Sequence, residues 1–167
     1  MSRVTDMSQM FKNCMAPPKS AGNYRRGVPT WNWDTSNVTN MYEMFMHFSE
    51  RHMPDVSSWD VTKVTNMART MMRVTFESAA SKGDTFKPPV WGPDGVQLDK
   101  WDPVECVNFN EFFLNTTTAG QNNQGGDRGT GTWRTPKAQH MVRMFKDSYA
   151  RDNLSDWCVP LIKSRPD

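Results

Sequence analysis

The segment from residue 33 to residue 45 reads Trp33-Asp34-Thr35-Ser36-Asn37-Val38-Thr39-Asn40-Met41-Tyr42-Glu43-Met44-Phe45. Nearly the same order of residue types returns at 59–67, and looser copies follow Trp101 and Trp133. A copy without its Trp stands at 3–13, and a shortened one at 154–162. Repetition of this kind is typical of repeat proteins. The sequence therefore predicts one repeat domain over residues 1–167, with units near 3–13, 33–48, 56–72, 98–114, 133–148 and 154–162.

The apolar positions within a unit have helical spacing. Residues 38–45 carry Val, Met, Met and Phe at relative positions 0, 3, 6 and 7, which fall on one face of an α-helix. The side-chain oxygens of residues 34–36 are suited to capping the first helical amides. We therefore expect a helix from about residue 37 to about residue 48 in this unit. A short strand is expected to end at each Trp, for example at 55–59, 96–101 and 154–157.

The repeated apolar residues are expected to form the core of the stacked units. The expected core residues are Trp33, Val38, Met41, Met44, Phe45, Trp59, Val64, Met67, Trp101, Phe109, Phe112, Phe113, Trp133, Met141, Met144, Phe145 and Trp157. A Met-x-x-Met stripe could also bind Cu(I) through its thioethers. However, Phe109 and Phe112 stand where other units have Met, and a position that accepts Phe is a packing position. No metal and no cofactor are expected.

Three insertions, near 14–30, 73–97 and 115–132, separate the units. Insertions in a stack of repeats leave it as surface loops, often on the binding face. Phe76, Phe86 and Trp91 in the second insertion are candidate contacts with a protein partner, because aromatic residues are enriched in interface hot spots. These three side chains could equally fold back and cover the stack. Further candidates for partner contacts are Tyr24, Arg25, Arg26, Asp127 and Arg128.

Composition argues against several function classes. The net charge is +2 with acids and bases mixed along the chain, whereas nucleic-acid binding needs a concentrated basic face. No apolar run approaches the roughly 20 residues of a transmembrane helix, and no signal peptide is visible. The three cysteines are expected to be buried free thiols, and the three histidines lack zinc-ligand spacing. The sequence contains no nucleotide-binding loop or nucleophile motif, so we do not expect an enzyme.

The Trp-Asp-x-Ser-Asn-Val-Thr-Asn-Met-x-x-Met-Phe pattern at 33–45 resembles that of the BspA-like leucine-rich-repeat surface proteins, whose repeats are also described as DUF285. The resemblance covers nearly all of the chain outside the insertions. Together with the expected helix and strand in each unit, it implies an α/β fold. We expect a short right-handed leucine-rich-repeat-like solenoid of about six irregular units with long loop insertions.

The resemblance also implies a function. Members of the family are mostly bacterial surface or secreted proteins linked to adhesion, and similar repeats occur in bacteriophage gene products. We expect a non-catalytic protein-binding or structural module on a surface, as a phage virion component that decorates the capsid or attaches to the tail. Its partner would then be a neighbouring capsid or tail protein in a larger assembly. The alternative is a BspA-like adhesin at the bacterial cell surface or outside the cell, which binds a receptor on host or partner cells.

Overall fold

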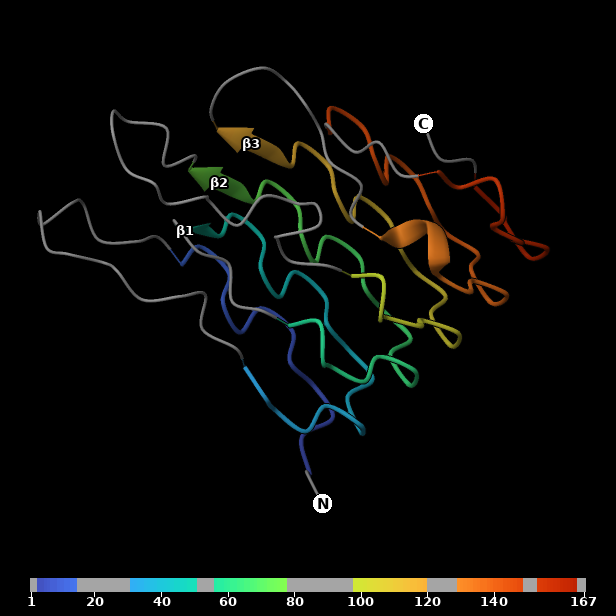
Figure 1. Cartoon of the computed structure of the whole chain (residues 1–167), viewed down its shortest axis with the longest axis horizontal. Coiled ribbons are helices and arrows are strands. Elements are labelled where there is room, and N and C mark those ends of the chain that lie inside the picture. The colour runs from blue at the N-terminus through green and yellow to red at the C-terminus, as the bar shows by residue number, and fades with distance from the viewer. Residues whose placement is uncertain are drawn as a thin grey trace, which may run out of the picture.

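The computed structural model describes residues 3–14, 31–50, 56–77, 98–119, 129–148 and 153–164. Its regular elements are short. They are the strands β1 (Ser49–Glu50), β2 (Thr75–Glu77) and β3 (Thr117–Ala119), and the 3-10 helix η1 (Thr130–Thr132). The three strands form a parallel sheet in the order β1-β2-β3 (Figure 1). Each strand follows the turn segment of a different unit, which is rich in Met before β1 and β2 and rich in Phe before β3. Equivalent parts of the repeat therefore lie side by side.

The prediction of an α/β leucine-rich-repeat-like solenoid is wrong. Within the described ranges the structure contains no α-helix, and residues 37–48 form a series of tight turns. In an α-helix each amide donates to the carbonyl four residues back. Here the amide of Glu43 donates to the carbonyl of Ala68 in the next unit, at 3.0 Å. The amide of Met44 donates to Met41, only three residues back, at 3.2 Å. Contacts between units therefore replace the bonds of a helix.

Left-handed residues recur in the turns of five units. Glu43 and His47 have φ values of 54° and 57°, and each is the third residue of a four-residue turn, where a type II turn requires positive φ. The same pair of positions, four residues apart, is left-handed in each of the other four units: Gln9 and Asn13, Arg69 and Arg73, Glu111 and Asn115, Arg143 and Asp147. Positive φ is uncommon for residues other than glycine. It excludes a continuous right-handed helix through this segment.

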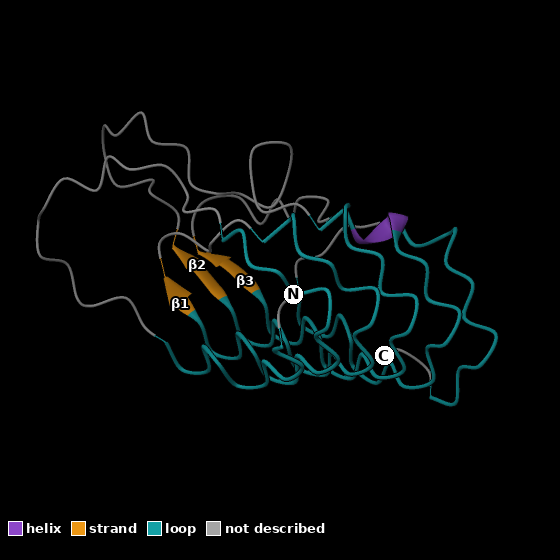
Figure 2. Ribbon diagram, turned by 90° about the horizontal axis from the view of Figure 1, so that it is seen from below, coloured by secondary structure: helices purple, strands orange, loops and turns teal. Residues whose placement is uncertain are grey.

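Neighbouring units are joined by a ladder of main-chain hydrogen bonds. Parallel bridges link one equivalent position in all six described segments: Asp6–Asn40, Asn40–Asn66, Asn66–Asn108, Asn108–His140 and His140–Ser164. Alternate amides extend the ladder, as in the 2.9 Å bond from Met67 to the carbonyl of Asn108. Figure 2 shows the resulting stack of turns beside the sheet. Residues at equivalent positions therefore lie in rows that run from one unit to the next.

The strands do not lie where the sequence predicts them. The described parts of 55–59, 96–101 and 154–157 form turns that end at each Trp. The amide of Trp59 donates to Val56 at 3.1 Å, and that of Trp101 donates to Leu98 at 3.0 Å. An amide that closes a local turn is not available for pairing with a neighbouring strand. The strands that pair in the sheet instead follow the turns, at Ser49–Glu50, Thr75–Glu77 and Thr117–Ala119.

The apolar rows meet in a continuous core. Val38, Met41, Met44 and Phe45 have no exposed surface. Phe109 and Phe112, which occupy the Met positions of the 98–114 unit, are also fully buried. The other core residues are buried or packed against this core, with Phe145 and Trp157 only partly buried. Trp33 was expected in the core, but this residue is 41% exposed. Its ring still stacks on that of Trp59, with centroids 5.6 Å apart.

Tryptophan side chains tie each unit to the one before it. In three successive units the indole N–H donates to the carbonyl three residues before the preceding Trp: Trp101 to Val56 (3.0 Å), Trp133 to Leu98 (2.7 Å) and Trp157 to Thr130 (2.8 Å). A buried carbonyl needs such a partner. The repeated Trp therefore contributes both apolar packing and a hydrogen bond between units.

Gly131, in η1, lies against the following unit. A β-carbon added there would stand 2.4 Å from the carbonyl oxygen of Asn153, a main-chain atom that cannot rotate away. We expect Gly131→Ala to lower the free energy of unfolding by about 1–3 kcal/mol, the usual cost of overpacking. Urea unfolding measures this, with Thr132→Ser in the same helix as the control. A Gly131→Ala protein as stable as the parent would contradict the close approach of these two units.

Candidate functional site

One row of the stack carries alternating charges. It is formed by the first left-handed residue of each of five units: Gln9, Glu43, Arg69, Glu111 and Arg143. Main-chain bonds hold these positions side by side: each of the first four amides donates to the carbonyl of the residue just before the next member of the row, at 2.9–3.0 Å. Side chains at equivalent turn positions lie on the same face of the stack. Opposite charges thus become neighbours across the units.

The charges are joined into a chain of ion pairs, here called the charge row, which comprises Lys12, Glu43, Arg69, Glu111 and Arg143. Lys12 Nζ lies 2.6 Å from Glu43 Oε2, and Arg69 Nη1 lies 3.1 Å from Glu43 Oε1. Arg69 Nε donates to Glu111 Oε2 at 2.6 Å, and Arg143 Nη2 pairs with Glu111 Oε1. Arg69 therefore bridges two carboxylates from two different units.

The two carboxylates of the charge row are buried, whereas its cations are partly exposed. The side chains of Glu43 and Glu111 are 5% and 7% exposed, against 28–46% for the three basic side chains. Burial alone raises the pKa of Glu43, but hydrogen bonds from Lys12, Tyr42 and Arg69 outweigh it and lower the pKa from 4.5 to about 2. The hydrogen bond with Glu43 raises the pKa of Tyr42, so its hydroxyl stays protonated at neutral pH.

The lowered pKa of Glu43 predicts a loss of stability in acid. Its folded-state pKa of about 2 lies below the ordinary value of 4.5, so its contribution is present above about pH 4.5 and is lost as the pH falls towards 2. The upper limit is about 3 kcal/mol, reduced by screening around the exposed parts of Lys12 and Arg69. Urea unfolding of the parent and of Glu43→Gln from pH 7 to pH 2 measures it. The stability difference should shrink with acid; a constant difference would contradict the pairing.

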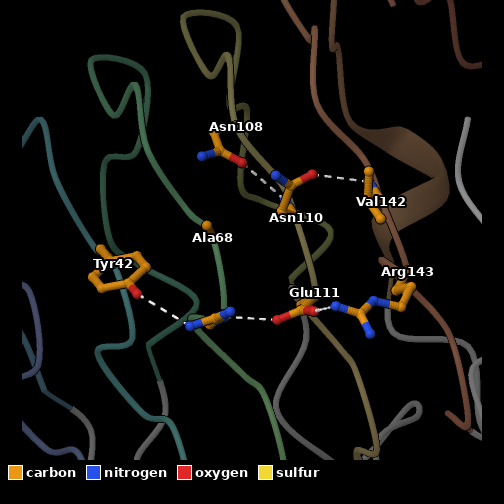
Figure 3. A pocket seen from close by; sticks show the side chains of 8 residues that line it. Tyr42, Ala68, Asn108, Asn110, Glu111, Val142 and Arg143 are labelled. Atoms are coloured by element: carbon orange, nitrogen blue, oxygen red, sulfur yellow. Dashed lines mark hydrogen bonds and ion pairs between the residues drawn. The ribbon is translucent and has the colours of Figure 1, made fainter. Parts of the chain in front are cut away.

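A polar groove of about 320 Å³ runs beside the charge row. Its lining residues come from four neighbouring units: Tyr42, Ala68, Arg69, Asn108, Asn110, Glu111, Val142 and Arg143. Figure 3 shows Tyr42 at one end of this groove and Arg143 at the other, with Asn110 and Glu111 between them. The groove is open to solvent, and its size lies at the lower end of the range of ligand sites.

Two asparagines of the groove are held in fixed orientations. Asn108 Oδ1 accepts the amide of Asn110 at 3.0 Å, an Asx turn that Asn40 and Asn66 repeat in their own units. His140 stands at the equivalent position of the next unit and has no side-chain carbonyl oxygen for such a turn. Asn110 Oδ1 accepts the Val142 amide there instead, at 2.9 Å. Because both oxygens are bound to main-chain amides, the two Nδ2 groups are the donors left over.

Of the predicted loop contacts, only Phe76 lies within the described residues. Phe76, predicted in a surface loop, lies in β2, where its main chain pairs with Glu50 and Thr118. Extended backbone next to two neighbouring strands accounts for this change, because Thr75–Glu77 continues the ladder beyond the Met-rich turns. The other candidates, Phe86, Trp91, Tyr24, Arg25, Arg26, Asp127 and Arg128, lie outside the described residues.

The charge row was not predicted from the sequence. Its members Glu43, Arg69, Glu111 and Arg143 stand at one variable position of the repeat, which reads as solvent-exposed under the helical interpretation. Lys12 follows the Phe position of its unit. One signal was available: the third position after the bridged residue reads Gln9, Glu43, Arg69, Glu111 and Arg143 in successive units. Alternating charge at one repeat position predicts ion pairs only once the units are known to lie in register. The parallel bridges between equivalent positions of neighbouring units show this register.

The described residues contain no group of three or more His, Cys, Asp or Glu side chains arranged to hold a metal ion. They also contain no helix with the length and apolar character needed to span a membrane. The cysteines differ from the expected buried thiols: Cys106 is buried, Cys14 is partly buried and Cys158 is exposed. Burial raises the pKa of Cys106 to about 12. This thiol therefore stays protonated at neutral pH and behaves as an apolar core residue.

The chain matches a known protein family. No curated protein and no solved structure matches the chain. One family does match, described as "Mycoplasma protein of unknown function, DUF285", and the matched residues are 1–87 and 94–164. The matched ranges contain every described unit, including all five members of the charge row. The chain therefore belongs to the DUF285 family.

Proposed function

We propose that this protein is a non-catalytic protein-binding or structural module displayed on a surface. The observation that carries the proposal is the register of the units, which brings equivalent residues of neighbouring units side by side in rows. Such rows form an extended face suited to contact with another macromolecule. The carboxylates beside the groove already accept hydrogen bonds from Lys12, Arg69 and Arg143. For Glu43 these bonds lower the pKa to about 2, which suits an ion-pair partner and not a proton-transfer group poised near neutral pH.

The surface we propose is that of a bacteriophage particle, where the protein decorates the capsid or attaches to the tail. The support is the residue pattern at 33–45, which resembles repeats found in phage gene products. The alternative is a bacterial surface adhesin, supported by the resemblance of the same pattern to BspA-like surface proteins. Both functions use a protein partner and an extended face. They differ in where the protein is found.

Quantitative mass spectrometry of purified phage particles from the source of this gene separates the two. For a virion component we expect this chain at a fixed molar ratio to the major capsid or tail protein, unchanged by high-salt washing and density-gradient repurification. Recovery at the bacterial cell surface or in the medium, with none in particles, would reject the virion role and support the adhesin. Recovery only from the cell interior would contradict both.

A further inference from the structure

We propose that the groove beside the charge row binds a carboxylate-bearing, acidic peptide segment of a protein partner. This rests on the proposed function in one respect, namely that the partner is a protein. The segment would lie across the units that contribute Asn108, Asn110, Arg69 and Arg143. Its carboxylate would meet the guanidinium groups, and its main-chain carbonyls would meet the two carboxamides.

Each side-chain oxygen of Glu111, Asn108 and Asn110 in the groove already accepts one hydrogen bond. Glu111 Oε2 accepts from Arg69 Nε, and Oε1 accepts from Arg143 Nη2. The side-chain oxygens of Asn108 and Asn110 accept main-chain amides of residues 110 and 142. A ligand that brings mainly hydrogen-bond donors would therefore have to share oxygens that already accept a bond, and its donors would be poorly satisfied.

The donors, in contrast, are in surplus. Arg69 uses Nε for Glu111 and Nη1 for Glu43 and Tyr42, while its Nη2 donates to no described residue. Arg143 uses Nη2 for Glu111, and its Nε and Nη1 make no bond to any residue in the described ranges. The Nδ2 groups of Asn108 and Asn110 are likewise not bonded to described partners. The groove therefore calls for a ligand rich in acceptors.

The net positive charge of the charge row favours an anionic ligand. The charge row holds three cations and two carboxylates, so one positive charge remains without a partner of its own. The side chains of Arg69 and Arg143 are 40% and 46% exposed, which leaves their guanidinium groups within reach of a ligand. Guanidinium groups bind carboxylates through paired, charge-assisted hydrogen bonds.

A peptide fits this set of donors better than an acidic sugar does. Each sugar hydroxyl brings a donor as well as acceptors, and that donor would have to share an oxygen that already accepts a hydrogen bond. A peptide with Glu or Asp brings carboxylates and a row of main-chain carbonyls. Its own amides can stay in solvent along the open side of the groove. The volume of about 320 Å³ matches one or two side chains and not a folded ligand.

The test uses hexaglutamate as the probe, with hexaglutamine as the uncharged counterpart, and isothermal titration at low ionic strength. The variant is Asn108→Asp, which turns a donor into an acceptor and adds one negative charge. It should fold, because Asp6 stands at the same position of its unit and accepts the amide of Ser8 at 2.7 Å. The matched control is Asn153→Asp, which adds the same charge at an exposed Asx turn to Ser155, away from the groove.

We expect saturable binding of hexaglutamate and not of hexaglutamine, a loss of at least about tenfold in Asn108→Asp, and no comparable loss in Asn153→Asp. Equal losses in both variants would mean unspecific attraction and would overturn the groove. No hexaglutamate binding, or binding of oligogalacturonate instead, would overturn the peptide ligand. Failure of the proposed function is seen separately, as absence of the parent protein from particles and cell surfaces. If the Asn108→Asp protein is found on particles or cell surfaces in the same amount as the parent protein, the groove assignment is overturned and the proposed function is not.

Discussion

Replacing Trp101 with alanine is expected to lower the free energy of unfolding by about 3–5 kcal/mol, the usual range for a buried aromatic residue. Its side chain is 1% exposed and stacks on Trp133 with centroids 6.2 Å apart. The substitution also leaves the carbonyl of Val56 without its indole partner, 3.0 Å away, and this carbonyl belongs to a buried residue. Both the cavity and the lost hydrogen bond act between units, so neighbouring units should unfold together.

Urea unfolding followed by tryptophan fluorescence and by circular dichroism measures the effect. The matched control is Trp33→Ala, because Trp33 is 41% exposed and stacks on Trp59. We expect the control to cost clearly less, since much of its ring remains in contact with water in the folded state. Equal losses at the two positions would show that Trp33 belongs to the core after all.

The second large effect is expected for Arg69→Ala, at about 2–4 kcal/mol. Arg69 bridges Glu43 and Glu111, whose side chains are only 5% and 7% exposed. Without the guanidinium, each carboxylate keeps only one cation but stays buried, and the loss of an ion-pair partner from a buried carboxylate is costly. We place the loss below the full cost of a broken buried pair, because Arg69 itself is 40% exposed.

Urea unfolding at pH 7 measures this loss, and its salt dependence adds a second readout, because screening weakens exposed pairs more than buried ones. The control is Arg134→Ala, which removes an exposed pair with Asp102 and should leave stability unchanged. The double variant Arg69→Ala with Glu111→Gln should lose less than the sum of the two single changes. Additive losses would show that the two side chains do not interact.

The repeat pattern predicted a helix where the structure has turns. Met41, Met44, Phe45 and Phe48 all point into the core, and their spacing of three, one and three residues is also that of a helix face. A series of four-residue turns places the same positions inward. Periodicity therefore cannot distinguish the two, and the helix prediction failed for that reason. What separates them is where the amides donate, and those acceptors lie in other units.

The turn chemistry was partly readable. Asp34 and Asp60, which follow Trp in two units, accept the amides of Ser36 and Thr62 at 3.2 and 2.9 Å, a local interaction that a short sequence specifies. The positive φ of Glu43 was not readable, because glutamate has no preference for that region. It is held there by bonds to Ala68, twenty-five residues away along the chain.

By itself, the sequence determined the number and order of the units, the apolar rows that fill the core, and the Asx turns at Asp and Asn. These depend on residue type and on neighbours close in the chain. Only the tertiary structure decided that the units are turns and short strands, and that Glu43, Arg69 and Glu111 form one row beside a groove. Those features depend on the register between units, because each amide and each charge finds its partner in the neighbouring unit.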